Sequence, residues 1–331
     1  MPQRHKDTKD FYEIKLKLCE SATLREINKE LKKNVASNFR AKTQRRKGKR
    51  IKFKISVFVA NMNFNLKIMI MKQDYNRIAL VGIEQEEYDI IKANYSGHII
   101  WHQSIPKIVV KDEVLYMEKA NGIGMLPVDK VVYYGIYDND FDFISGLAIW
   151  RGACYPNAAA MLDCRFKIPC LVKALSHSRF SAPRGFISAG ASVTVTDDTV
   201  AKWGNWHCGE NKHRFTGEWE SEFTATTEPY FEGEAVRIMI IGDVYWQIKL
   251  EGDSWLKSIH PDDAGFMEVD PELLADTLHI KNTLQMDMIG NDYIVAKDGT
   301  KYLLEVNHIP NITRFEDVRQ VYLSTVIEWI N

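Results

Sequence analysis

Apolar and polar positions alternate in short blocks from residue 77 onward. Ile78–Ile83 is a mainly apolar run typical of a buried strand, and the spacing of Glu84–Asn94 after it favours a helix. The alternation continues to residue 150 and predicts a small α/β unit with a partly parallel sheet. The other elements expected in this unit are strands at Lys107–Val110, Val114–Met117 and Val131–Ile136 and a helix at Phe141–Trp150.

Helical spacing returns at Ala158–Ala174, and strand-like segments dominate the chain after it. Two apolar runs, Val236–Ile241 and Val244–Leu250, flank Gly242-Asp243, and this combination is a good hairpin signal. The remaining expected elements are strand-like segments at Phe186-Ile187, Ser192–Val195 and Val200–Lys202, a polar loop at Gly204–Gly217, and helices at Pro271–Asn282 and Phe315–Ile330.

The composition is that of a globular protein. Of the 331 residues, 45% are hydrophobic and 11% aromatic, which is enough for two or three packed units. No apolar run approaches the roughly 20 residues that span a bilayer, and the charged amino terminus is unlike a signal peptide. The 5 cysteines are irregularly spaced, so we expect a cytoplasmic protein without a disulfide framework and without a membrane partner.

Positive charge is concentrated at the amino end. Residues 1–54 hold 18 of the 43 Lys and Arg residues but 6 of the 44 Asp and Glu residues. A helix is expected at Thr8–Asn34, followed by the basic tract Arg40–Arg50. Such a cluster can bind phosphate groups, so nucleic acid is a candidate partner of residues 1–61 only. The alternatives are a solvated accessory tail and translation upstream of the true start, because Met62, Met69 and Met71 precede the first predicted strand.

Two predicted strands near the carboxyl end carry oxygen-bearing side chains. Asp287 lies on the first, and Glu305 and Asn307 lie on the second, with a turn at Lys297–Gly299 between them. Side chains two positions apart in a strand share a face, so Glu305 and Asn307 point the same way. Asp292 is interpreted as a turn residue. Two carboxylates and an amide oxygen make a site of the kind that Mg²⁺ accepts together with phosphate oxygens.

These strands, together with an upstream segment, resemble the ATP-grasp superfamily, nearest in style to its glutathione-synthetase-like and ribosomal-protein glutamate-ligase-like members. Glu232–Asp243 resembles the segment that brings an arginine to the phosphates, and Met286-Asp287 and Leu304–Pro310 resemble the metal-binding strands. The resemblance covers about residues 77–330. It implies an α+β and α/β architecture, the ATP-grasp fold, in which two α+β lobes clasp ATP behind a small α/β domain.

The resemblance also implies a division of the chain. A basic extension, partly disordered, is expected at 1–61, a pre-ATP-grasp α/β domain at 62–157 and an ATP-grasp domain at 158–331. Within the last, we expect a lid lobe at about 183–228 and a metal-binding lobe at about 229–331.

Single residues receive roles from the same resemblance. Asp287, Glu305 and Asn307 would hold one or two Mg²⁺, or Mn²⁺, bridging the phosphates of ATP. Arg237 would contact the phosphates or an acylphosphate, with a cross-strand ion pair as the alternative. If the hairpin turns tightly, Lys249 points to the face opposite Arg237. The other residues given a role are Lys167 and Lys202 for the phosphates, Lys173 as a competitor of Lys167, Glu228, Tyr230 and Phe231 for the adenosine, and Lys257 beside Lys249 as a substrate or phosphate contact.

One segment departs from the family pattern. Many relatives have a short, glycine-rich loop after the lobe lysine, whose backbone N–H groups wrap the phosphates. Trp203–Phe215 is instead bulky and basic, and could act as a lid through Lys212, His213 and Arg214 or face the acceptor.

The resemblance implies a Mg²⁺- and ATP-dependent carboxylate–amine, or carboxylate–thiol, ligase. In this chemistry a carboxylate attacks the γ-phosphate and an amine displaces phosphate from the acylphosphate, while the enzyme positions groups and neutralises charge. Two alternatives stay open: a kinase of a small hydroxylated metabolite, and a non-catalytic nucleotide-binding module with a nucleic-acid-binding tail. Small-molecule and peptide acceptors both fit. The sequence leaves the oligomeric state open, and a homo-oligomer is one possibility because members of the family often form dimers or tetramers.

Overall fold

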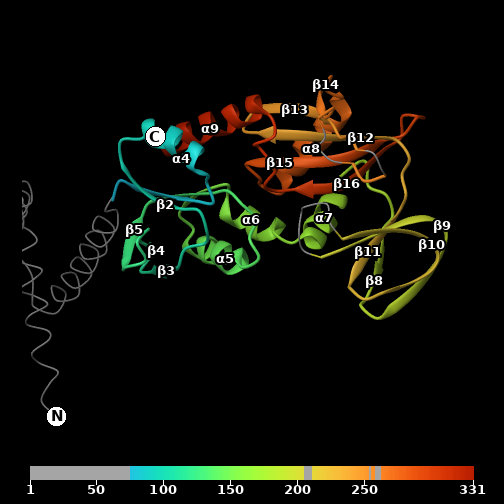
Figure 1. Ribbon diagram of the computed structural model, residues 1–331, viewed down its shortest axis with the longest axis horizontal. Coiled ribbons are helices and arrows are strands. Elements are labelled where there is room, and N and C mark those ends of the chain that lie inside the picture. The colour runs from blue at the N-terminus through green and yellow to red at the C-terminus, as the bar shows by residue number, and fades with distance from the viewer. Residues whose placement is uncertain (1–74, 205–210, 253–254, 258–261) are drawn as a thin grey trace, which may run out of the picture. The chain divides into compact units, whose positions relative to one another are not determined.

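The computed structural model describes residues 75–204, 211–252, 255–257 and 262–331. The helix expected at Thr8–Asn34 and the basic tract Arg40–Arg50 lie outside these residues. The described part of the chain combines one parallel sheet, three antiparallel sheets and the helices between them (Figure 1), which confirms the mixed α/β architecture. No helix within it is long and apolar enough to span a membrane.

The first sheet is parallel and has the strand order β2-β1-β6-β7. Alternate residues of β1 (Arg77–Val81) pack against α4 on one face and α5 on the other, so the strand is apolar throughout. The predicted strands and helices up to residue 150 are present, and β2, β5 and β7 are strands that the sequence did not predict. The elements of this region are β2 (His98–His102), β6 (Lys130–Tyr133), β7 (Ala153–Tyr155), α4 (Gln85–Ala93), α5 (Asp140–Trp150), and an antiparallel sheet of β3 (Ile108–Lys111), β4 (Val114–Glu118) and β5 (Met125–Val128).

The helix expected over Ala158–Ala174 is interrupted. It consists of α6 (Ala158–Cys164) and α7 (Lys167–Leu175), separated by an extended residue, Phe166. Pro169 has no N–H to donate to the carbonyl of Arg165, so a helix running straight through would lose a hydrogen bond and clash. The interruption makes Lys167 the first residue of α7.

The second large sheet is antiparallel, in the order β10-β9-β11-β8. Its two longest strands are β9 (Ala191–Trp203), which joins two segments predicted separately, and β10 (Lys212–Ser221). The loop expected at Gly204–Gly217 is therefore wrong from residue 212 onward. From Phe215 onward β10 alternates between covered and exposed positions, but two of the covered positions hold Gly217 and Ser221, so its sequence shows only a weak apolar alternation. The sheet is completed by β8 (Gly185–Ile187) and β11 (Ala225–Pro229).

The carboxyl-terminal sheet has five strands in the order β14-β13-β12-β15-β16. One face packs against α6, α7 and α8, and part of the other face packs against α9. The predicted turns at Gly242-Asp243 and Lys297–Gly299 and both predicted helices are confirmed. The elements are β12 (Glu234–Ile241), β13 (Val244–Lys249), β14 (Gly265–Met267), β15 (Met288–Val295), β16 (Lys301–Asn307), α8 (Pro271–Thr283) and α9 (Glu316–Ile330).

Candidate functional site

A cavity lies between the β8–β11 sheet and the part of the five-stranded sheet that α9 leaves uncovered. Apolar and aromatic residues line one end, and charged residues line the other. The lining residues are Val200, Lys202, Lys212, Glu228, Pro229, Tyr230, Phe231, Gly233, Ala235, Leu250, Trp255, Leu256, Lys257, Asp292, Ile294, Leu304 and Glu305.

A bulge in β16 decides which carboxylates meet in this cavity. Tyr293 pairs with Leu303, but the next pair is Asp292 with Glu305, so Leu304 is an extra residue. A regular hairpin would pair Glu305 with Asn291 and turn it toward α7 and α8. The bulge instead places Glu305 directly across from Asp292 on the cavity side.

Asp287 is the residue that the sequence predicted in this position, but it lies before β15 and apart from the pair of Asp292 and Glu305. It precedes β15 and is an odd number of residues from Asp292, so the two side chains do not share a face. Its Oδ2 atom accepts a hydrogen bond of 2.5 Å from the backbone N–H of Asn157, the N-cap residue of α6. Asp292 is not a turn residue but the interior of a strand.

Arg237 binds Asp292 across β12 and β15. Nε donates to Oδ1 at 2.6 Å and a terminal nitrogen donates to Oδ2 at 2.9 Å. Burial alone would lower the pKa of Arg237, but the charge of Asp292 and these hydrogen bonds outweigh it and raise the pKa. The cross-strand ion pair considered as an alternative is thus present, and it holds the arginine at the charged end of the cavity.

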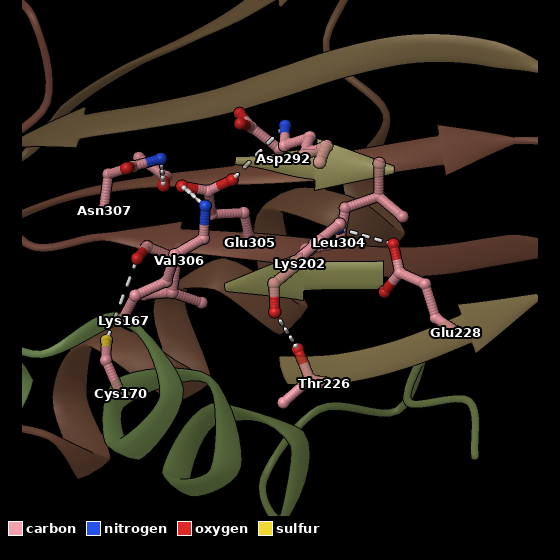
Figure 2. A network of polar contacts seen from close by, with 12 residues as sticks. Lys167, Cys170, Lys202, Thr226, Glu228, Asp292, Leu304, Glu305, Val306 and Asn307 are labelled. Carbon is pink, nitrogen blue, oxygen red and sulfur yellow. Dashed lines mark hydrogen bonds and ion pairs between the residues drawn. The ribbon is translucent and has the colours of Figure 1, made fainter. Parts of the chain in front are cut away.

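Glu305 is the centre of the charged end (Figure 2). Its Oε1 atom is 3.4 Å from Nζ of Lys167, and its Oε2 atom is 4.0 Å from Nζ of Lys212. Burial lowers the pKa of Lys212, Glu305 opposes that effect, and the nearby Lys202 adds to it. Asn307 follows on the same face, and its Nδ2 donates to the carbonyl of Gly290 at 3.3 Å, which leaves its amide oxygen for a ligand.

Glu228 lies between two cations of the second sheet. Its carboxylate is 2.5 Å from Nζ of Lys202 and 2.7 Å from Nε of Arg184, and all three side chains are buried. Burial lowers the pKa of Arg184, and Glu228 opposes this shift. Both cations also contact β16. Arg184 donates to the carbonyl of Leu303 at 2.6 Å. Lys202 donates to the carbonyl of Leu304 at 3.5 Å, and Figure 2 shows Lys202, Leu304 and Glu228 together.

The apolar end of the cavity is lined by Tyr230 and Phe231, which follow β11 in the chain. Tyr230 lies under the guanidinium of Arg214, whose carbon is 3.5 Å from the ring centre, and Arg214 also binds Asp198. Phe231 stacks on Tyr302 with ring centres 4.0 Å apart. Both residues line the cavity near the buried carboxylate of Glu228, and we call this apolar end of the cavity the slot at Tyr230 and Phe231.

Lys249 and Lys257, the last two predicted contacts, lie in different places. Lys257 lines the cavity, and its Nζ donates to the carbonyl of Gly252 at 2.7 Å. Lys249 is outside the lining and binds Glu251 and Glu234 at the surface. It pairs with Val236, so it does point away from the face of Arg237. Lys173, the competitor of Lys167, pairs with Asp163 on exposed helix faces.

Sequence reasoning missed Asp292, and it did not consider Arg184. A signal for Asp292 existed, because a carboxylate inside an apolar strand needs a buried partner and Arg237 stands inside another apolar strand. Arg184 follows Ala182-Pro183 in an irregular segment that shows no comparable pattern.

The charged end suits a polyanion together with a hard cation. Five cationic side chains outnumber three carboxylates there among the described residues. No three His, Cys, Asp or Glu residues in that part of the chain cluster tightly enough to hold a metal by themselves. A divalent ion would therefore take Asp292, Glu305 and the amide oxygen of Asn307, an all-oxygen set that fits Mg²⁺.

Comparison with known proteins gives the same architecture. No family model and no curated protein matches the sequence. Among solved structures, the chain is similar to D-alanyl-alanine synthetase A from Vibrio cholerae, with a TM-score of 0.53 and 12% identity over 78% of this chain and 98% of that chain. The chain has the ATP-grasp fold.

Two further ATP-grasp structures match over a similar length. One is the macrocyclase MdnC from Microcystis aeruginosa, bound with the precursor peptide MdnA, with a TM-score of 0.51 and 13% identity over 76% of this chain and 99% of that chain. The other is a RiPP-associated ATP-grasp ligase from Chryseobacterium gregarium in complex with ADP and a leader and core peptide. It has a TM-score of 0.50 and 13% identity over 76% of this chain and 95% of that chain.

Proposed function

We propose that this protein is a Mg²⁺- and ATP-dependent ligase that joins a carboxylate to an amine or a thiol. The observation that carries the proposal is the set of oxygen ligands Asp292, Glu305 and Asn307 beside an excess of buried cations, inside an ATP-grasp fold. The ADP- and peptide-bound neighbours support this choice of chemistry. The division of the chain at residues 61 and 157, the cytoplasmic location and the homo-oligomer stay predictions.

Different residues along the cavity would contact different parts of the bound nucleotide and its metal ion. The slot at Tyr230 and Phe231 would hold the adenine ring, and Lys202 would leave Glu228 to bind phosphate oxygens. Asp292, Glu305 and Asn307 would hold Mg²⁺, which supplies charge neutralisation and fixes the phosphate oxygens when it is bound. Arg237 orients Asp292, because it donates two hydrogen bonds to that carboxylate.

In the reaction, an oxygen of the acceptor carboxylate forms a bond to the γ-phosphorus of ATP as the bond to the ADP oxygen breaks. The amine, or the thiol, then attacks the acyl carbon, loses a proton and releases inorganic phosphate. Lys167 and Lys202 would donate hydrogen bonds to phosphate oxygens, so the protein contributes mainly position and charge.

Calorimetry with the full chain tests the nucleotide site. We expect ATP to bind in the presence of Mg²⁺, and Glu305→Gln to weaken that binding about tenfold or more, because one ligand charge is lost with little change of shape. Glu328→Gln, on the exposed face of α9, is the matched control and should bind as wild type does. Absence of Mg²⁺-dependent binding in the wild-type protein would overturn the proposal.

A product screen separates the ligase from its rivals. ATP is incubated with pooled amino acids and peptides, and ADP, phosphate and amide products are measured by mass spectrometry. An amide formed with release of ADP and phosphate supports the ligase. A stable phosphorylated hydroxyl compound identifies a kinase instead, and tight binding without turnover of any acceptor favours a non-catalytic module.

A further inference from the structure

Lys212 reaches across the cavity from the second sheet to the five-stranded sheet. It is the first residue of β10, its side chain is 17% exposed, and its Nζ lies 4.0 Å from Oε2 of Glu305. That separation is longer than a hydrogen bond. Lys167 approaches the other oxygen of the same carboxylate, so Glu305 is shared by two ammonium groups. Among the residues that the structure describes, Glu305 is the carboxylate that both lysines approach as an ion pair.

Lys212 and Lys202 approach different carboxylates. The two residues are register partners in β10 and β9, and Lys202 is bound to Glu228. The carboxylate nearest to Lys212 is Glu305, which belongs to the candidate metal site. Lys212 therefore stands at the metal end of the cavity, where the terminal phosphate of a bound triphosphate would lie.

The charge balance indicates an anionic ligand at this end. A largely buried ammonium group is costly unless it is paired and hydrogen-bonded. Glu305 cannot neutralise Lys167 and Lys212 together, and it is also the residue that a divalent cation would require. A phosphate group provides several oxygens that accept hydrogen bonds from both lysines.

We propose that Lys212 is a catalytic residue that binds the terminal phosphate of ATP and stays bound to it as it moves to the acceptor. This inference rests on the proposed function. The lysine remains protonated throughout: it donates hydrogen bonds to the oxygens of the phosphoryl group, while the bond to the ADP oxygen breaks and the bond to the acceptor oxygen forms. A side chain from β10 would thereby act where many relatives use backbone N–H groups of a glycine-rich loop.

A purely structural role for Lys212 makes a different prediction. If it only joined the two sheets through Glu305, its removal would weaken ADP and ATP binding alike. A contact to the terminal phosphate should matter for the triphosphate alone. The ratio of the two affinities therefore distinguishes the roles.

The test is calorimetry of the full chain with ADP and with AMPPNP, a non-hydrolysable triphosphate, in the presence of Mg²⁺. For Lys212→Met we expect AMPPNP binding to weaken about tenfold or more, the loss typical of one charge-assisted hydrogen bond, and ADP binding to change less than about threefold. Lys212→Gln should reproduce this selectivity, and Lys212→Arg should restore most of the AMPPNP affinity. Lys107→Met, an exposed lysine beside β3, is the control and should change neither.

The outcomes separate the two proposals. If wild type binds both nucleotides but Lys212→Met and Lys212→Gln weaken both equally, or neither, the role of Lys212 is overturned and the nucleotide site stands. If wild type binds neither nucleotide, the proposed function fails and this inference fails with it. Selective loss of AMPPNP affinity in both variants, with ADP binding kept as evidence of folding, supports Lys212 as a phosphate contact.

Discussion

Arg237 and Asp292 face each other across β12 and β15, joined by hydrogen bonds of 2.6 and 2.9 Å, with both side chains 14% exposed. Arg237 stands between Val236 and Ile238, and both side chains of the pair are largely buried, so each charge depends on the other for a close partner. The pair therefore contributes to the fold as well as to the candidate site.

Removal of one partner should destabilise the protein strongly. We expect Arg237→Met to lower the free energy of unfolding by about 3 kcal/mol, because it leaves the Asp292 carboxylate buried without its cation. The double variant Arg237→Met, Asp292→Leu should lose less than the sum of the single changes. Urea unfolding of all four proteins measures the coupling, and strictly additive losses would contradict a direct pair.

The metal site distinguishes Asp292 from Asp287. We expect Asp292→Asn to abolish the Mg²⁺ dependence of ATP binding, because it removes a charged ligand next to Glu305. Asp287→Asn should keep that dependence, since Asp287 binds the backbone N–H of Asn157 instead. Titration of both variants with ATP, with Mg²⁺ and with EDTA, provides the measurement. The reverse result would return Asp287 to the site.

Asp270 should make the stability of α8 depend on pH. Its Oδ1 accepts hydrogen bonds from the N–H groups of Glu272 and Leu273, and Oδ2 is 2.6 Å from Nζ of Lys301. Burial tends to raise the pKa of Asp270, but Lys301 and the backbone donors outweigh burial and lower it. A folded-state pKa below that of the unfolded chain means that the ionised group stabilises the fold above the unfolded value of about 3.9.

We therefore expect Asp270→Ala to cost about 1 kcal/mol at pH 7 through loss of the cap. Asp270→Asn keeps a cap oxygen but loses the charge. Its stability difference from wild type should be present at pH 7 and vanish as the pH falls through the acid range below about 3.9, where Asp270 itself becomes protonated. Urea unfolding across this range measures it, and a difference that does not shrink as the pH falls below about 3.9 would argue against a charge effect.

Loss of the Asp140 charge should lower the free energy of unfolding more than loss of an exposed aspartate in a similar ion pair. It is fully buried and accepts hydrogen bonds from Tyr133, from the backbone of Tyr137 and from Nε of Arg165. Asp140→Asn leaves the Arg165 charge uncompensated, so we expect a loss of about 3 kcal/mol or more.

The matched control for Asp140 is Asp163→Asn, which breaks the exposed pair with Lys173 and should cost less than about 1 kcal/mol. Thermal and urea unfolding compare the two. Similar losses in both variants would mean that burial of the Asp140 pair has no energetic consequence.

Much of the architecture follows from local pattern. The hairpin at Gly242-Asp243, the turn at Lys297–Gly299 and the helices α8 and α9 depend on neighbouring residues, so the sequence indicates them directly. The interruption between α6 and α7 could also have been predicted from the sequence, because Pro169 excludes a continuous helix. The edge strand β10 was not predicted, because Gly217 and Ser221 occupy two of its covered positions and leave only Phe215 and Trp219 as apolar signals.

In the candidate site too, some features follow from local sequence and others depend on the tertiary structure. The sequence by itself determined that Glu305 and Asn307 share a face, because side chains two apart in a strand point to one side, and that Arg237 is a charge inside an apolar strand. Tertiary structure decided their partners. The bulge at Leu304 turns Glu305 toward Asp292 rather than toward α7 and α8, and strand pairing brings Lys212 to the cavity. A one-residue shift of register reverses every face, and the register is fixed by long-range packing that no local pattern contains.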